Sequence, residues 1–432
     1  MGAYRKYTES VISLAVSKPK MKTLLFSVIL LLSLRDGLRA QSRGIDYYLE
    51  QALRNSPLLK DYRNQVLTNQ LDSQRIRAGY KPQVAASSNN SYAPVINGFG
   101  YDYAITNGGN LTAVVGVTQT LVSRRNLNTQ LETLRIQNQG LENTASISEQ
   151  DLKRTIIAQY ITTYGSFEQL AFTRETEALL QKEERVLKTL TEKNVYRQTD
   201  YLTFLVTLRQ QQLAVRQLDI QYRNDYATLN YLSGIVDTAA VPLQEPGIML
   251  HALPGPEHSV FFRKYELDSL QLTNSRALID FSYKPKISLF ADGGYNSSFA
   301  FEAYKNFGTS FGVNITVPIY DGRQRKLQYS KLAIAERTRT GYKDFYTSQY
   351  RQQVAQLRQQ LQGTEALIGD INQQITYSEG LVNAHARLLE TGDAKIADLV
   401  IALNNYLAAK NLLIQNNVSR LQIINQINYW NR

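Results

Sequence analysis

The sequence predicts a duplicated membrane protein that combines β-strands with very long helices. Two observations lead to this fold class. Tyr80-Lys81-Pro82 recurs as Tyr283-Lys284-Pro285 roughly 200 residues later, so the chain contains two copies of one half rather than a solenoid of short repeats. After each copy come two runs of alternating apolar and small polar residues, and then a long stretch without proline. Each half is therefore predicted to fold as a short helix, two strands and two long helices.

The first repeat is expected to cover residues 41–235. Alternation and the absence of proline predict its elements, which are strands at 82–94 and 110–122 and helices at about 124–194 and 197–233. The second repeat, residues 259–432, is expected to follow the same order. Its strands are predicted at 285–296 and 308–320, and its long helices at about 323–390 and 394–430. Prolines between Pro242 and Pro256 mark residues 236–258 as a linker.

The alternation in the strands fits two environments. A half-buried strand of a soluble protein shows it, but runs of about 10–12 residues also have the length of a tilted strand that crosses a bilayer. The loops between the runs are rich in Gly, Asn, Ser and Tyr, as expected outside a membrane. We therefore expect one face of the strands to contact lipid and the other to contact water. The residues expected to face lipid are Leu111, Val115, Val117, Ile287, Leu289, Phe311, Val313, Ile315 and Val317.

Four strands are too few to close a barrel by themselves. All backbone groups of a barrel in lipid must be paired, and the smallest common barrels have about eight strands. Two chains would supply eight strands and three chains would supply twelve. Because the interior of an eight-stranded barrel is filled by side chains, the small polar inner face favours a wider lumen. We therefore expect three chains to form one twelve-stranded barrel.

The first helix of each long pair, about 67 residues, would measure on the order of 100 Å. Apolar residues recur in these stretches at three- and four-residue steps, as in Leu127-x3-Leu131 and Tyr350-x3-Val354-x2-Leu357. This spacing is typical of a coiled-coil seam. A cytoskeletal coiled coil would show the same seam, but it would lack the strands and an export signal.

The N-terminus predicts such a signal. Met21-Lys22 is a short basic segment, residues 23–34 are apolar, and Ala40 supplies the small residue of a cleavage site. We therefore expect a signal peptide at residues 21–40, preceded by an upstream extension at 1–20. The chain has no cysteine, which excludes disulfides, thiolate metal sites and a lipid anchor on a mature N-terminus.

Charge and motifs point away from several classes of function. Residues 1–40 carry +5 of the formal net charge of +11, and the remaining +6 is expected to lie on solvated helix faces among acidic residues. No nucleic-acid partner is therefore predicted. The three histidines are scattered, and the sequence has no glycine-rich phosphate loop and no nucleophile motif. We predict no enzyme activity, no cofactor and no metal site.

Several segments together resemble a known family. Val317-Pro318-Ile319-Tyr320-Asp321-Gly322 precedes the long helix of the second repeat, and Gly392 and Asp398-Leu399 mark the turn at the far end of that helix. The first repeat has a degraded copy of the former segment, from Thr120 to Arg124. With the strand pairs and the helix pairs, this arrangement resembles the TolC family of outer-membrane efflux proteins over about residues 41–432.

The resemblance implies a homotrimer in the outer membrane of a Gram-negative bacterium. It implies a twelve-stranded β-barrel in outer-membrane lipid above a large periplasmic α-barrel of antiparallel coiled-coil helices. Such a channel-tunnel belongs to a tripartite efflux system and passively conducts substrates from a periplasmic adaptor and an inner-membrane pump of the RND, ABC or a similar class. The outer-membrane component of a type I protein-secretion system is an alternative. A periplasmic coiled-coil scaffold without a pore is another. The substrate lies outside what the sequence indicates.

The resemblance also assigns roles to the helix tips. Acidic residues at the start of the returning helices would narrow the tunnel mouth, which implies gate residues Asp393 and Asp398, with Asp200 on the other tip. The residues implied to dock the adaptor are Val195, Tyr196, Arg197, Gln198, Thr199, Gly392, Ala394, Lys395, Ile396, Ala397 and Leu399. Independently of the family, Gly392 is expected to end its helix, and a carboxylate at Asp398 is favoured by the helix dipole.

Overall fold

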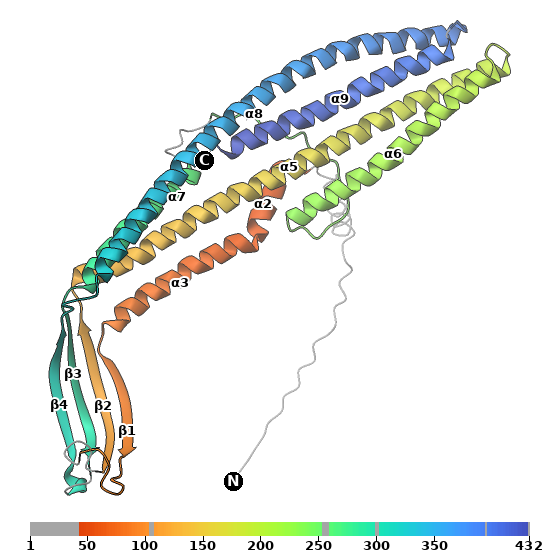
Figure 1. Ribbon diagram of the computed structural model, residues 1–432. Helices are drawn as coiled ribbons and strands as arrows, with labels where there is room; N and C mark the ends of the chain where they lie inside the picture. The colour runs from red at the N-terminus through yellow and green to blue at the C-terminus, as the bar shows by residue number, and fades with distance from the viewer. Residues whose placement is uncertain (1–42, 103–107, 253–258, 299–301, 394, 431–432) are drawn as a thin grey trace, which may run out of the picture.

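The computed structural model describes residues 43–102, 108–252, 259–298, 302–393 and 395–430. They form one elongated, curved body, with the strands at one end and the tips of the long helices at the other (Figure 1). The architecture confirms the predicted combination of long antiparallel helices with a four-stranded sheet. The predicted extension at 1–20 and signal peptide at 21–40 lie outside the described residues.

The first repeat folds in the predicted order. Its elements are α2 (Ile45–Asn55), α3 (Pro57–Gly79), β1 (Gln83–Tyr92), β2 (Gly109–Leu121), α5 (Arg124–Glu192) and α6 (Gln198–Leu232). The single short helix expected at its start is in fact two helices. Pro57 has no N–H with which to continue α2, and it begins α3 instead, where Ser56 Oγ accepts from the N–H of Leu59 at 3.4 Å.

The second repeat has its strands and long helices in the same order, and its last strand is shorter than predicted. Its elements are α7 (Val260–Ser282), β3 (Lys286–Ser297), a 3-10 turn η2 (Ala303–Lys305), β4 (Phe307–Thr316), α8 (Gln324–Thr391) and α9 (Ile396–Tyr429). The alternation predicted a strand as far as residue 320, but β4 ends at Thr316. Pro318 lacks the N–H that would continue the ladder, and the alternation of side chains does not register this loss.

Each long helix begins with a cap next to the sheet. In the first repeat, Ser123 Oγ accepts from the N–H of Asn126 at 3.2 Å. In the second, the carboxylate of Asp321 accepts from the N–H groups of Arg323 at 2.9 Å and Arg325 at 2.7 Å. These bonds pair donors that would otherwise be unsatisfied at the first turn. The degraded copy of the family segment has therefore lost its aspartate and glycine but kept the capping function.

The strands form one antiparallel sheet in the order β1-β2-β3-β4. Strand β2 of the first repeat pairs directly with β3 of the second, for example Val117 with Ala291. The sheet is open, because β1 and β4 each have only one neighbouring strand among the described residues.

Helix α5 is the element on which the others pack: it contacts α3 and α6 from its own repeat and α7 and α9 from the other. Buried tyrosines hold the middle of this body. Tyr48 Oη of α2 donates to Tyr226 Oη of α6 at 3.0 Å, and Tyr160 Oη of α5 donates to the carbonyl oxygen of Gln244 at 2.7 Å. Burial raises the pKa of Tyr160 to about 12, so this hydroxyl remains a donor. The linker is thereby fastened to α5.

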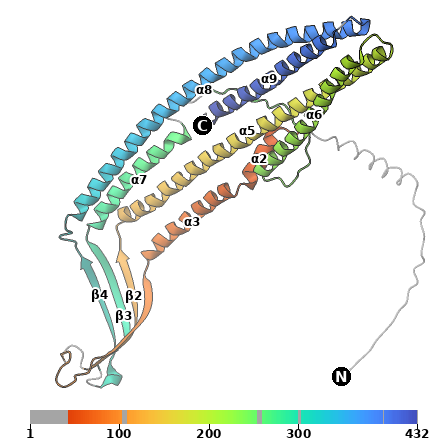
Figure 2. The ribbon, with the colours of Figure 1, turned by 45° about the vertical axis from the view of Figure 1, so that its right-hand side comes forward.

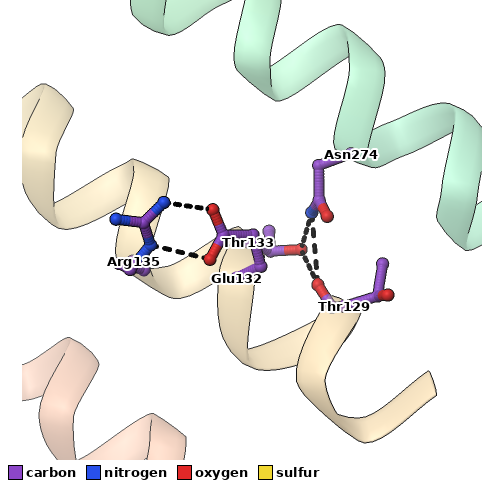
Figure 3. Close-up of polar contacts among 5 residues, drawn as sticks. All are labelled: Thr129, Glu132, Thr133, Arg135 and Asn274. Carbon is purple, nitrogen blue, oxygen red and sulfur yellow. Dashed lines mark hydrogen bonds and ion pairs between the residues drawn. The ribbon is translucent and has the colours of Figure 1, made fainter. Parts of the chain in front are cut away.

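Nearer the sheet, a polar contact joins the two repeats (Figure 3). Nδ2 of Asn274 in α7, a buried side chain, donates to the Thr129 carbonyl at 3.2 Å and to Thr133 Oγ1 at 2.7 Å, both in α5. Beside this contact, Arg135 donates to both carboxylate oxygens of Glu132 at 2.6 and 2.7 Å. A buried amide left without partners costs about 1–3 kcal/mol, so the contact favours one register of α7 on α5.

We predict that Gly294→Ala destabilises the sheet and that Gly308→Ala, at the position paired with it, does not. A Cβ at Gly294 (φ +155°) would lie 2.3 Å from the carbonyl oxygen of Ala113, whereas a Cβ at Gly308 would meet nothing within 4 Å. Overpacking of this kind costs roughly 1–3 kcal/mol. The thermal midpoint of the purified protein in detergent, followed by circular dichroism, should fall for Gly294→Ala alone. Equal midpoints would contradict the observed pairing of β2 with β3.

Candidate functional site

The sheet has one apolar face. Residues paired directly across an antiparallel sheet share a face, and Val84, Val117, Ala291 and Phe311 form such a row. The same face carries the predicted lipid-facing residues that lie within the strands: Leu111, Val115, Val117, Ile287, Leu289, Phe311, Val313 and Ile315. Val317, predicted with them, lies beyond the end of β4. In the single chain much of this face is exposed, for example 86% of Phe311 and 61% of Ile315.

The opposite face is small and polar. Its residues include Ser87, Thr112, Thr118, Ser288, Asp292, Asn296, Ser310 and Asn314. Phe290 interrupts the pattern, but it pairs with Gly312, where a Cβ would lie only 2.6 Å from the Phe290 ring. The missing side chain of Gly312 therefore makes room for the ring. A sheet with these two faces can separate an apolar phase from water.

The two helix tips, at the other end of the body, are built alike. Asn194 after α5 and Gly392 after α8 have left-handed backbones, with φ +61° and +84°. In each tip the next N–H donates five residues back, from Val195 to the Leu190 carbonyl and from Asp393 to the Leu388 carbonyl, both at 2.9 Å. This is the bonding of a Schellman helix end, and it confirms the predicted cap at Gly392.

An apolar core locks the two tips together. The buried side chains that form it come from α5, α6, α8 and α9 and are Leu180, Leu187, Phe204, Leu208, Val382, Leu389, Ile396, Leu399, Ala402 and Leu403. Val195 of the first tip lies against Gly392 of the second, so close that a Cβ on the glycine would be 2.8 Å from Val195 Cγ1. The assignment of Ile396 and Leu399 to an adaptor-docking surface is therefore wrong, since they are 3% and 1% exposed in this core.

The remaining tip surface is mostly polar. The exposed residues among those predicted to dock an adaptor are Val195, Arg197, Gln198, Thr199, Lys395 and Ala397. Tyr196 is partly buried against the tip core, and Gly392 is partly covered. Ala394 lies outside the described residues.

The acidic residues of the tips are not equivalent. Asp200 and Asp398 are each the third residue of a returning helix, and both are therefore close to the positive end of a helix dipole. Asp200 is partly buried and accepts from the N–H of Arg197 at 3.3 Å. Asp398 and Asp393 are exposed, and neither side chain forms an ion pair with the residues that the structure describes. The carboxylates predicted to form a gate are thus available on the second tip only.

One buried acid at the tip was missed in the sequence. Glu183 of α5 is 8% exposed and lies in the buried stripe between Leu180 and Leu187. Burial raises the pKa of this carboxyl group, the nearby charge of Glu390 raises it further, and Lys182 opposes the shift. The signal was present, because an acidic residue three positions after one seam leucine and four before the next occupies a seam position.

Several solved structures of membrane proteins have this architecture. A membrane protein from Pseudomonas aeruginosa matches with a TM-score of 0.71 and 15% identity over 89% of each chain. The outer membrane protein VceC from Vibrio cholerae matches with a TM-score of 0.69 and 13% identity over 90% of this chain and 96% of that one. The open state of the MtrE outer membrane channel from Neisseria gonorrhoeae matches with a TM-score of 0.68 and 14% identity over 89% of this chain and 88% of that one. The chain has the TolC fold.

This likeness is one of structure, because the sequence matches no protein-family model and no curated protein. The proteins that share the TolC fold here are channels and outer-membrane proteins rather than enzymes, in line with the expectation from sequence. Within the described residues, no helix combines the length and the hydropathy needed to cross a bilayer.

We predict that Gly392→Ala loosens the tips, whereas Gly380→Ala in the interior of α8 does not. Alanine at position 392 would have to adopt a left-handed backbone, which costs about 1–2 kcal/mol, and would collide with Val195. A Cβ at Gly380 meets nothing within 4 Å. Limited proteolysis of the tip should be faster for Gly392→Ala, and adding Val195→Ala should restore part of the loss. No change in cleavage would contradict the packing of one tip on the other.

We predict that the stability of the tip core falls as the pH rises, because of Glu183. The pKa of Glu183 in the folded protein is raised above the usual value of 4.5. Below pH 4.5 the carboxyl group is protonated in both the folded and the unfolded protein, so it does not affect stability. Above the folded pKa the buried group is charged, which disfavours the folded protein. Glu183→Gln should therefore increase the hydrogen-exchange protection of the tips at pH 7.5 but not at pH 4. Glu175→Gln, at an exposed position of α5, is the control. A pH-independent gain would assign the effect to packing rather than to charge.

Proposed function

We propose that the protein is an outer-membrane channel that passively conducts substrates out of the cell envelope. The observation that carries this proposal is the open four-stranded sheet, which is apolar on one face and polar on the other and is continuous with helix pairs of tunnel length. The apolar face would contact lipid and the polar face would line a water-filled lumen. The fold shared with the MtrE and VceC proteins supports this assignment.

Three copies of the chain would complete the channel. The outer edges of β1 and β4 carry unpaired backbone groups, which cannot be left unpaired in lipid. Pairing β4 of one copy with β1 of the next satisfies both edges without any new element. Three copies give twelve strands, enough to leave a lumen lined by the small residues of the polar face.

The tips would form the periplasmic entrance. Their exposed polar surface, which includes Arg197, Gln198, Thr199 and Lys395, would contact a periplasmic adaptor that connects the channel to an inner-membrane pump. The exposed carboxylates of Asp393 and Asp398 would lie at the mouth of the tunnel. Energy would come from the pump, because conduction through the channel itself is passive.

The deciding experiment is single-channel recording in a planar bilayer. A conduit should give discrete conductance steps after the purified protein inserts, whereas a periplasmic scaffold would give none. A channel that serves protein secretion would conduct ions as well, so the identity of the neighbouring pump distinguishes the two transport roles.

We predict that a charge on the apolar face of β4 prevents assembly, whereas the same charge one residue away is tolerated. Val313→Lys would expose an ammonium group to lipid, at a cost of roughly 2–4 kcal/mol near the bilayer midplane. Asn314→Lys, on the opposite face, would expose it to the lumen. The fraction of protein that reaches the membrane as folded oligomer should fall for Val313→Lys alone. Greater sensitivity at Asn314 would exchange the lipid and lumen faces.

We predict that Asp398 controls block of the channel by multivalent cations. Three copies of an exposed carboxylate around a narrow mouth would attract cations. Asp398→Asn should weaken block by divalent or trivalent cations added on the periplasmic side and should raise conductance. Asp200→Asn should do less, because Asp200 is already engaged with the backbone of Arg197. Equal block in wild type and Asp398→Asn would leave Asp398 only a helix-capping role.

A further inference from the structure

Basic residues gather where the strands meet the helices. Four segments reach this junction: residues 75–82, 119–125, 280–286 and 320–326. They carry ten basic residues and two acidic ones, Asp280 and Asp321. We call the basic residues the junction belt; they are Arg75, Arg77, Lys81, Arg124, Arg125, Lys284, Lys286, Arg323, Arg325 and Lys326. The segments that join the strands at the other end, 93–108 and 298–306, carry one basic residue and two acidic ones.

This concentration corrects the expectation that the charge is spread along the helices. The mature chain was expected to carry +6 in all, and the junction segments alone carry +8. The net positive charge of the mature chain is therefore concentrated at one end of the sheet, on both repeats. The junction presents its basic residues as a rim. It does not present the compact patch with base-stacking aromatic residues that a nucleic-acid-binding protein would have.

The two acids at the junction are already engaged. Asp280 pairs with Arg325 at 2.7 Å. Asp321 accepts from the N–H groups of Arg323 and Arg325 at the start of α8. Among the described residues, eight members of the junction belt are exposed and form no ion pair: Arg77, Lys81, Arg124, Arg125, Lys284, Lys286, Arg323 and Lys326.

Helix dipoles do not account for the positive field. The N-termini of α5 and α8 lie at the junction, but the C-termini of α3 and α7 lie there too (Figure 2). Since the two kinds of helix end carry opposite partial charges, their effects largely cancel. The side chains of the junction belt thus determine the local potential.

The junction belt begins where the apolar face of the sheet ends. The last rows of that face contain Leu121, Ile287 and Ile315. Just beyond β4, Ile319 and Tyr320 are 96% and 83% exposed and are followed within three residues by Arg323. Exposed apolar and aromatic side chains next to cations are typical of the boundary between hydrocarbon and headgroups.

We propose that the junction belt, apart from Lys286 on the polar face of β3, binds the phosphate groups of anionic phospholipids in the membrane leaflet on the helix side of the barrel. The inference rests on the proposed function, because it requires the apolar face to be in lipid. Unpaired ammonium and guanidinium groups at headgroup level would attract anionic lipids over zwitterionic ones, and Arg can bind phosphate through two N–H groups. The far rim of the sheet, with its net negative loops, would show no such preference for this lipid class.

The test measures lipid selectivity by electron spin resonance. The full-length protein is reconstituted in phosphatidylcholine vesicles with trace spin-labelled phosphatidylglycerol or phosphatidylcholine, and the motionally restricted fraction of each gives their relative association constant. We expect a preference for phosphatidylglycerol of at least threefold at 0.05 M NaCl, falling towards one at 0.5 M because salt screens the attraction. A variant in which Lys81, Arg124, Arg125 and Lys326 are changed to Gln should lose most of the preference for phosphatidylglycerol.

The matched control removes four cations from the tip end of α5, where no lipid is expected. Its substitutions, also to Gln, are at Lys182, Arg185, Lys188 and Lys193, and it should keep the wild-type preference. A wild-type protein that inserts and conducts but shows no preference would overturn the inference and leave the proposed function intact. A belt variant that shifts the ion selectivity of the pore without changing lipid preference would also overturn it, by placing the cations in the lumen. Failure to insert into any vesicle would overturn both.

Discussion

The pairing of backbone groups at the two open edges of the sheet is the constraint on which the rest of this molecule depends. A lipid environment offers no partner for an N–H or C=O group, and β1 and β4 each have a free edge. If the apolar face lies in lipid, as we propose, the chain is incomplete as a monomer, and closure by identical copies would explain why four strands suffice. The long helices follow directly from the strand ends, and each begins at a cap, Ser123 in the first repeat and Asp321 in the second.

Much of the fold could be predicted from sequence because strand and helix periods differ so clearly. The period of two assigns side chains to faces, and the predicted lipid-facing residues within the strands do share one face. The absence of proline predicted long helices, and α5 and α8 end within two residues of the predicted limits. The error at β4 arose because alternation describes side chains, whereas the strand ends for a backbone reason at Pro318.

The site was harder to predict because its properties depend on contacts between distant segments. Ile396 and Leu399 are in a tip in sequence, but four helices bury them, which only the packing of one hairpin on the other could reveal. The burial of Glu183 was missed for the same reason, although its position in the seam of α5 indicated it. Similarly, Phe290 breaks the polar pattern in sequence and fits in space, because its partner across the sheet is Gly312. Local sequence patterns therefore predict helices and strands, whereas contacts between distant segments determine which residues remain exposed and available for function.

The duplication gives the chain two kinds of tip, which differ in how their acidic residues are held. Asp200 is bonded to the backbone of its own tip, while Asp398 is exposed at the same helix position. In the first tip, the left-handed residue is Asn194, and the next residue, Val195, lies against Gly392 of the second tip. The first hairpin therefore has its acidic residue engaged locally, and the second presents exposed carboxylates. Because both hairpins contribute side chains to one apolar core, a movement of the second would also move the first. In the threefold assembly that we propose, the two hairpins of each copy would therefore act as one unit at the entrance.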